Sequence, residues 1–112
     1  MGLFISHSGT EAKVTQLMTV SGTLSDFRIR IDAAPASNKG LRYTVRKNGA
    51  DTTVTCEIDD TSSPNTSCFD TTHSVSFTAD TDTITIGVTA PTTAGKSSAA
   101  ATVRWTAKYT QP

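Results

Sequence analysis

The sequence predicts an all-β protein, a single antiparallel β-sandwich or jelly roll of about seven or eight strands. Three observations support this prediction. Apolar and polar residues alternate with a period of two in several segments, which is typical of strands with one buried and one solvated face. Polar turn residues separate these segments at intervals of roughly 10 to 15 residues. Thr makes up roughly a fifth of the chain, and its β-branched side chain favours strands over helices.

The alternating segments define both the expected strands and the expected core. Strands are predicted over 13–20, 24–32, 40–47, 50–58, 75–77, 84–88 and 103–109. The apolar residues that share the inward register and form the predicted core are Phe27, Ile29, Ile31, Tyr43, Val45, Phe77, Ile84, Ile86, Val103, Trp105 and Tyr109. Burial of each large apolar side chain stabilises the fold by about 1.5–3 kcal/mol.

The connections also indicate antiparallel strands. Asn48-Gly49 lies between two alternating segments, and this pair favours a type I′ hairpin because both central residues need positive φ. The strands on either side should therefore pair directly. Polar loops are expected over 33–40, 59–67 and 91–98, and a tight turn over 80–82.

The length of 112 residues fits one domain. We expect residues 1–11 to form an N-terminal arm, either loose or folded against something else, and residues 12–112 to form the sandwich. No apolar run approaches the length of a bilayer span, so no membrane partner is expected. The chain has 10 basic and 10 acidic residues, whereas nucleic-acid binders usually carry a basic excess. Nucleic acid is therefore not an expected partner.

The two cysteines flank a polar loop. Cys56 and Cys68 are twelve positions apart, and a disulfide between them would close the loop. The alternative is two reduced thiols that act as small hydrophobic side chains. Zinc is disfavoured, because no CxxC spacing and no nearby pair of histidines completes four ligands.

The sequence gives little support for catalysis. Its two histidines are His7 and His73, and Asp70 and Ser74 lie near the second. The members of a catalytic triad usually come from separate segments, so we interpret His73 as a surface residue at a strand edge. We expect no enzymatic activity.

Acidic residues offer two further possibilities. Asp59 and Asp60 with Asp70, or Asp80 with Asp82, would supply oxygen ligands for calcium, but the regular spacing of a calcium loop is absent. A glycosidase needs two carboxylates that meet in space, yet almost all acidic residues fall in turns or on solvated faces. We expect no metal and no cofactor.

Two sets of side chains suggest a binding surface. Trp105 and Tyr109 share one face of a strand and would form a sugar platform if that face were solvated, but their register favours the core. The outward basic residues would line one sheet and face an acidic partner. The favoured interpretation is a solvated face whose charges protect edge strands. These residues are Arg28, Arg30, Arg42, Arg46, Arg104 and Lys108.

Several of these segments carry a resemblance to a known group. They are the run Tyr43-Thr-Val-Arg-Lys-Asn-Gly49, the run 52–56, Cys68 with 70–75, and the closing Arg104-Trp105. Together they resemble a loose family of small β modules encoded by tailed bacteriophages. The resemblance covers about residues 20–109, and it implies a trimeric jelly roll related to the tumour-necrosis-factor-like fold. It transfers no functional site.

Members of this family occur as capsid decoration (cement) proteins or as parts of tails and fibres. The chain begins with its own Met and ends soon after its last strand, which favours a free-standing decoration protein. We therefore expect a homotrimer, made in the host cytoplasm, that binds the lattice of major capsid protein on the outer capsid surface. An arm containing Leu3, Phe4 and Ile5 is the expected capsid contact. The alternative is a receptor- or glycan-binding module of a tail, a fibre or a cell-surface protein, and a small hydrolase is less favoured.

Overall fold

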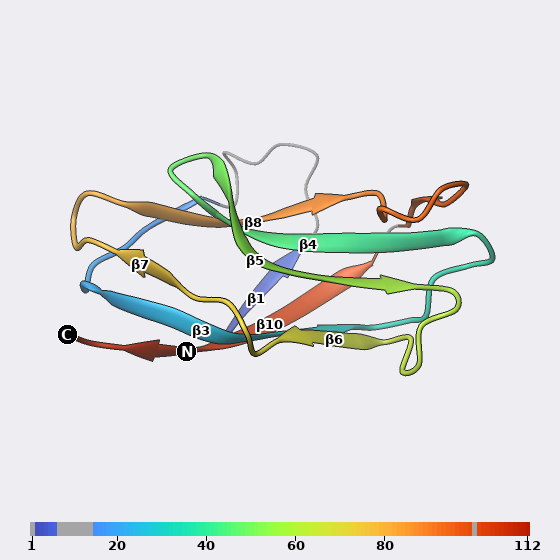
Figure 1. The fold of residues 1–112 in the computed structure, drawn as a ribbon, viewed down its shortest axis with the longest axis horizontal. Helices are drawn as coiled ribbons and strands as arrows, with labels where there is room; N and C mark the ends of the chain where they lie inside the picture. The colour runs from blue at the N-terminus through green and yellow to red at the C-terminus, as the bar shows by residue number, and fades with distance from the viewer. Residues whose placement is uncertain (1, 7–14, 100) are drawn as a thin grey trace.

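The computed structural model describes residues 2–6, 15–99 and 101–112, and the side chains of all of these except 2–6. It confirms the all-β prediction: within these residues the chain forms strands and no helix, and two antiparallel sheets pack face to face (Figure 1). The strands are β1 (Gly2–Ser6), β2 (Gln16–Leu17), β3 (Gly22–Ile31), β4 (Lys39–Lys47), β5 (Ala50–Asp59), β6 (Ser67–Asp70), β7 (Val75–Phe77), β8 (Thr83–Thr89), β9 (Ser97–Ser98) and β10 (Thr102–Thr110).

Each sheet is built from strands that are far apart in the sequence. The first sheet has the order β1-β10-β3, and β6 and β7 both pair with the free edge of β3. The second sheet has the order β2-β8-β4-β5, and the short β9 pairs in parallel with the start of β4. The antiparallel pairs are therefore nested: β1 with β10, β2 with β8, β3 with β6 and β7, and β4 with β5. This nesting is the strand order of a jelly roll.

The hairpin between β4 and β5 forms as the sequence predicts. Asn48 and Gly49 both have positive φ, at 54° and 79°, as a type I′ turn requires. The pairing of Lys47 with Ala50 follows directly from this turn.

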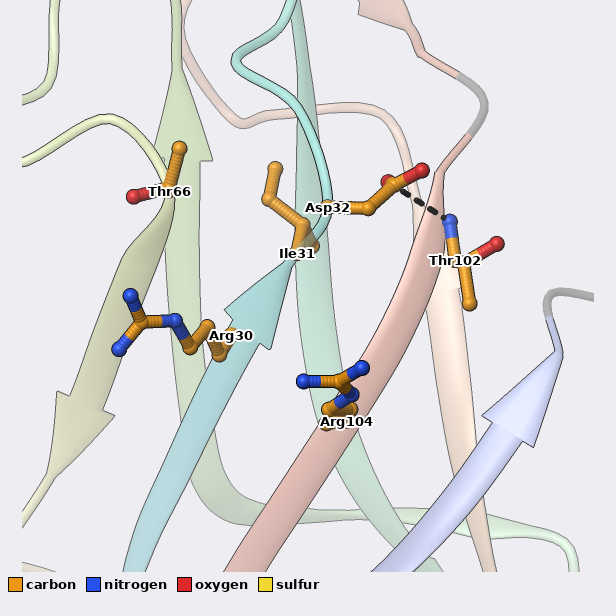
Figure 2. A pocket seen from close by; sticks show the side chains of 6 residues that line it. All are labelled: Arg30, Ile31, Asp32, Thr66, Thr102 and Arg104. Carbon is orange, nitrogen blue, oxygen red and sulfur yellow. Dashed lines mark hydrogen bonds between the residues drawn. The ribbon is translucent and has the colours of Figure 1, made fainter.

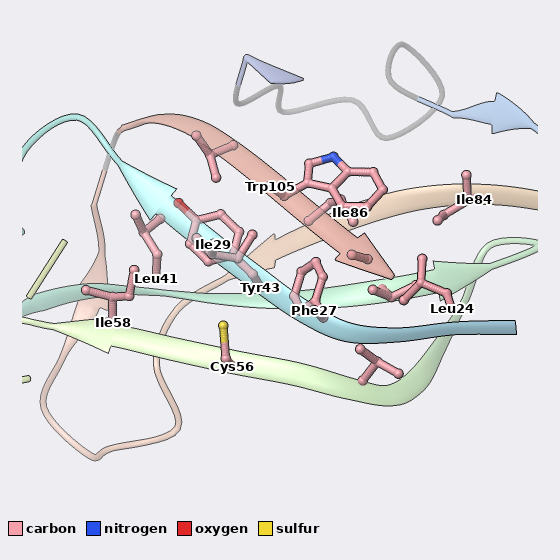
Figure 3. Packing of buried hydrophobic residues seen from close by; sticks show 14 of the residues in the cluster. Leu24, Phe27, Ile29, Leu41, Tyr43, Cys56, Ile58, Ile84, Ile86 and Trp105 are labelled. Carbon is pink, nitrogen blue, oxygen red and sulfur yellow. The ribbon is translucent and has the colours of Figure 1, made fainter. Parts of the chain in front are cut away.

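The core lies between the two sheets (Figure 3). Phe27 and Trp105 are its largest aromatic pair, with ring centroids 6.1 Å apart. All the predicted core residues are buried except Tyr109, which lies partly buried at the margin of the cluster. Its hydroxyl donates a hydrogen bond to the carbonyl oxygen of Val20 over 2.5 Å, so its polar end reaches the surface while its ring packs on the core.

An irregularity in β3 keeps its apolar residues inside. The pairing with β10 shifts register between Thr106 and Lys108, so that two residues of β3, Asp26 and Phe27, oppose one residue of β10. Asp26 takes the left-handed φ of 50°. This is a β-bulge, and it allows Leu24 and Phe27 to face the core together although three positions separate them.

The second predicted feature of the N-terminal region, the strand before residue 21, is shorter than expected. The strand expected over 13–20 is limited to Gln16–Leu17 in the described residues, and positions 13 and 14 lie outside them. Met18 follows this short strand, its side chain is buried, and its backbone forms hydrogen bonds with the backbone of Asp80 and Asp82. Leu3, Phe4 and Ile5 of the expected arm lie in β1, whose backbone pairs with β10. The other residues of the arm, except Gly2 and Ser6, lie outside the described residues.

A disulfide joins the two sheets. Cys56 on β5 and Cys68 on β6 are bonded, with their Cα atoms 5.8 Å apart. The bond ties the outer strand of the second sheet to the first sheet, on the side where the chain crosses between them.

Replacing both cysteines with Ser should lower the free energy of unfolding by about 3 kcal/mol, because the bond closes a short loop and restricts the unfolded chain. Urea unfolding of the oxidised wild type and of Cys56→Ser/Cys68→Ser measures this difference. The reduced wild type is the control, and it should behave like the variant. Equal stability of oxidised and reduced protein would contradict this assignment of the bond's contribution.

Candidate functional site: the arginine face

The outer surface of the first sheet carries a compact group of arginines. Alternation along β3 places Ile29 and Ile31 in the core, so Arg28 and Arg30 point outward and are exposed. On β10, Val103 and Trp105 are buried, so Arg104 and Thr106 lie on the same outer surface. β6, which pairs with the other edge of β3, adds Ser67 and Phe69. We call this surface the arginine face, and its members are Arg28, Arg30, Ser67, Phe69, Arg104 and Thr106.

Two rows of side chains cross the three strands. In one row, Arg104 lies directly opposite Arg30, and Arg30 lies opposite Ser67. In the other, Thr106 lies opposite Arg28, which lies opposite Phe69. Figure 2 shows Arg30 and Arg104 side by side on neighbouring strands. Like charges directly opposite each other on two strands are destabilising, so Arg30 and Arg104 repel each other across this row.

Phe69 is an exposed aromatic residue of this surface. Its relative exposure is 62%, and the guanidinium carbon of Arg28 lies 5.3 Å from its ring centroid. A cation over an aromatic face at this distance is weakly attractive. The stacked pair therefore presents a charged group and an apolar group together.

Carboxylates lie at both ends of the arginine row on β3. An oxygen of Asp26 lies 2.9 Å from a terminal nitrogen of Arg28. At the other end, Asp32 accepts a hydrogen bond of 3.1 Å from the backbone N–H of Thr102 (Figure 2). The charges along β3 thus run acidic, basic, basic, acidic.

The face is hollowed at two places. A depression of about 380 Å³ lies at the Asp32 end, and another of about 360 Å³ lies beside Phe69. Both are lined by Arg30 and Arg104. The two arginines therefore stand at the centre of the surface, with a hollow on either side.

The structure corrects the prediction for the basic residues as a group. Arg28, Arg30, Arg104 and Lys108 lie on the first sheet, but Arg42 and Arg46 lie on β4 in the second sheet. They do not line one sheet. Nor do they protect edge strands, because β3, β4 and β10 are each paired on both sides. Alternation predicted that these side chains point outward, but it does not reveal which strands become neighbours.

Asp70 and His73 come together in the turn after β6. Their Oδ2 and Nδ1 atoms are 2.9 Å apart, and Asp70 also accepts hydrogen bonds from the backbone amides of Thr55, Thr72 and His73. Burial alone would raise the pKa of Asp70, but these hydrogen bonds outweigh it and hold the pKa at about 2. The carboxylate thus fastens the turn to β5. In the described residues, Ser74 is exposed and forms no hydrogen bond with the imidazole.

Two of the remaining acidic candidates, Asp82 and Asp60, are also engaged in loop contacts. Asp82 is bonded to the side chain of Asn48 and to the backbone N–H of Thr78, and Asp60 is paired with Lys96. Within residues 2–6, 15–99 and 101–112, no three His, Cys, Asp or Glu side chains form a group suited to a metal ion. His7 lies outside the described residues.

Among the side chains that the structure describes, the open aromatic ring is one that the sequence did not single out. Trp105, a candidate for a sugar platform, is only 2% exposed, whereas Phe69 is open. The segment around Phe69 has no apolar alternation, and its outward direction depends on the pairing of β6 with β3. In the sequence, the one local signal that could have drawn attention to Phe69 was its position next to Cys68.

Comparison of the chain with family models, with curated proteins and with solved structures finds no match. In the part of the chain that the structure describes, no helix is long and apolar enough to cross a membrane.

Replacing Arg30 with Thr should stabilise the protein by a few tenths of a kcal/mol at low salt, because it removes the repulsion with Arg104 and Thr suits a strand. Thermal unfolding in low salt and in 1 M salt, where the Debye length is only about 3 Å, measures this effect. The gain should shrink in high salt. Arg42→Thr is the matched control, because Arg42 lies opposite Glu57 and its loss should not stabilise. A less stable Arg30→Thr variant would contradict the repulsion.

Replacing Asp70 with Asn should destabilise the protein by about 2 kcal/mol near pH 6, because the depressed pKa of about 2 represents extra stability of the charged form. That stability is present above the unfolded-state pKa of about 3.9 and is lost as the pH falls through about 2. Urea unfolding of wild type and variant between pH 6 and pH 2 should show the two curves converging. The exposed Asp51→Asn serves as the control, and a difference independent of pH would contradict the charge-based explanation.

Proposed function

We propose that this chain is a non-catalytic virion structural protein, a decoration (cement) protein that stabilises a bacteriophage head. It would act on the outer capsid surface by binding the assembled lattice of major capsid protein. The resemblance to small phage β modules supports this proposal, and so does the all-β sandwich with a jelly-roll strand order. Both features suit a protein that works by presenting a surface.

The observation that carries the proposal is the arginine face. It combines three arginines with an open aromatic ring on the flat side of a sheet. Protein–protein interfaces are enriched in Arg and aromatic residues. A bound partner with acidic groups on its surface would complement the charge of these side chains.

Stabilisation of the head follows from mass action. A protein that binds the assembled shell and not its free subunits shifts the equilibrium away from disassembly. A homotrimer, as the resemblance implies, would bring three copies of the arginine face to the shell and raise the avidity of binding. The protein would be made in the host cytoplasm, where thiols stay reduced, and the disulfide would then form after release from the cell.

A receptor- or glycan-binding module of a tail, a fibre or a cell surface is the second candidate. Phe69 favours it, because an exposed aromatic ring beside Arg28 is a suitable platform for a sugar. A glycan array would distinguish the two: selective binding of one sugar class would favour this candidate over a decoration protein.

The proposed function is tested with heads of the encoding virus that lack this protein. Purified protein should sediment with such heads, and bound heads should release their DNA at a higher temperature than bare heads. DNA release is followed by the fluorescence of a DNA-binding dye during heating. Light scattering on a sizing column should give a mass of about three times 11.8 kDa for the free protein.

Two outcomes would count against this function. Heads that neither retain the protein nor gain heat resistance would remove the decoration role. A monomer in solution that also stays monomeric on heads would remove the trimer and leave the decoration role in place.

A further inference from the structure

We infer that the bond between Cys56 and Cys68 is a redox-controlled latch on strand β6. With the bond formed, β6 is held against the second sheet. With the bond reduced, β6 and the turn after it separate locally from β3, while the two sheets stay folded. The latch is a property of the free chain, whatever that chain binds.

The segment around β6 buries very little apolar surface. All residues over 61–74 are described, and the one buried residue among them is the polar Asp70. Cys68 is the apolar side chain of this segment that packs against the core. Ser67 is partly exposed and Phe69 is 62% exposed. Because apolar burial is the main source of folding stability, a segment with so little of it is among the first parts of a chain to open.

Two ties join β6 to the second sheet, and both reach neighbouring residues of β5. One is the disulfide from Cys68 to Cys56. The other is the hydrogen bond of 3.2 Å that Asp70 accepts from the backbone N–H of Thr55. A covalent bond does not open with thermal fluctuations, whereas a single hydrogen bond does. The disulfide is therefore the main restraint that keeps β6 against the second sheet.

The rest of the sandwich does not depend on β6. The other edge of β3 pairs with β10 along the strand, and β7 pairs with the first residues of β3. Phe27 and Trp105, the largest aromatic pair of the core, lie on β3 and β10, and β5 pairs with β4. Opening is therefore confined to β6 and its flanking turns, and it removes Ser67 and Phe69 from the arginine face.

The partner that opens the latch is a thiol. A thiolate attacks one sulfur of the bond, which forms a mixed disulfide and releases the other cysteine as a thiolate. A second thiolate then attacks the sulfur of the first reductant molecule and releases the remaining cysteine. Overall, the reductant thiols lose two electrons and become a disulfide, while Cys56 and Cys68 gain two electrons and two protons. Because the cytosol keeps thiols reduced and the extracellular space does not, the compartment sets the state of β6.

The backbone hydrogen bonds of β3 provide a readout with an internal control. Ile31 donates its backbone N–H to the carbonyl oxygen of Thr66, and hydrogen-bonded pairs alternate along antiparallel strands. The register then places between β3 and β6 a set that we call the β6-side amides, those of Phe27, Ile29, Cys68 and Asp70. The intervening amides of β3, those of Arg28 and Arg30, point toward β10 and are called the β10-side amides.

The experiment follows amide hydrogen exchange by NMR in the purified chain, first oxidised and then reduced with a dithiol. Reduction should raise the ratio of β6-side to β10-side exchange rates at least about tenfold, because local opening exposes only the first set. The ratio cancels the general loss of stability that both sets share. In the reduced chain, the β6-side rates should stay nearly constant up to about 1 M urea, because local opening exposes little surface, whereas the β10-side rates should rise.

Two variants test the assignment to the disulfide. Cys56→Ser/Cys68→Ser should show the raised ratio without any reductant. Asp60→Asn is the matched control, because it weakens the pairing with Lys96 in the loop next to β6 and leaves the bond intact. In its oxidised form, the ratio should stay within about twofold of wild type. Reduction of the wild type carries the test if the Ser variant does not fold.

Three outcomes would overturn the latch. The first is an unchanged ratio on reduction, or a rise of both sets by the same factor, because the bond would then act on global stability alone. The second is a reduced chain that unfolds completely, since the opening would not be local. The third is an equal rise in the ratio for oxidised Asp60→Asn, because any disturbance of the neighbouring loop would then open β6. All of these measurements use the free chain, so the decoration role stands or falls separately.

Discussion

The pairing of β3 along both of its edges fixes the register on which the core and the arginine face depend. β10 pairs with one edge, and β6 and β7 share the other. A slip by one residue would expose Phe27 and Ile29 and turn Arg28 and Arg30 into the core. Burial of an unpaired guanidinium is very costly. The same constraint that protects the core therefore also holds the arginines outward, and the bulge at Asp26 adjusts the strand so that both faces are satisfied.

Carboxylates, rather than apolar contacts, hold the loops of the sandwich in place. Asp70 fastens the turn after β6 to β5, and Asp82 fastens the turn before β8 to the β4–β5 hairpin. Glu57 holds the loop after β8 by accepting hydrogen bonds from Thr92. In each case a single side chain satisfies backbone or side-chain groups from a distant segment. This use of acidic residues explains why a chain with many polar turns needs few apolar residues outside its core.

The period-two pattern was sufficient to predict the fold class, the long strands and the β4–β5 hairpin, because these depend on local alternation and on the turn chemistry of Asn48 and Gly49. Strands β6 and β9 are too short to show a pattern, and their pairing partners are distant in sequence. The outward direction of each arginine was predictable, because it also depends only on local alternation. Their division between two sheets, and the position of Phe69 beside Arg28, depend on strand order, which alternation does not encode.

The disulfide between Cys56 and Cys68 also affects how the chain responds to proteases. The segment between the two cysteines contains the exposed residues Thr61, Ser63, Pro64 and Asn65, and exposed polar loops are preferred sites of cleavage. A cut there would divide the chain, but the sulfur–sulfur bond would still join the two fragments. β5 would remain paired with β4, and β6 with β3. A cleaved molecule would therefore keep both sheets and its arginine face, and only reduction together with cleavage would break the covalent link between the two fragments.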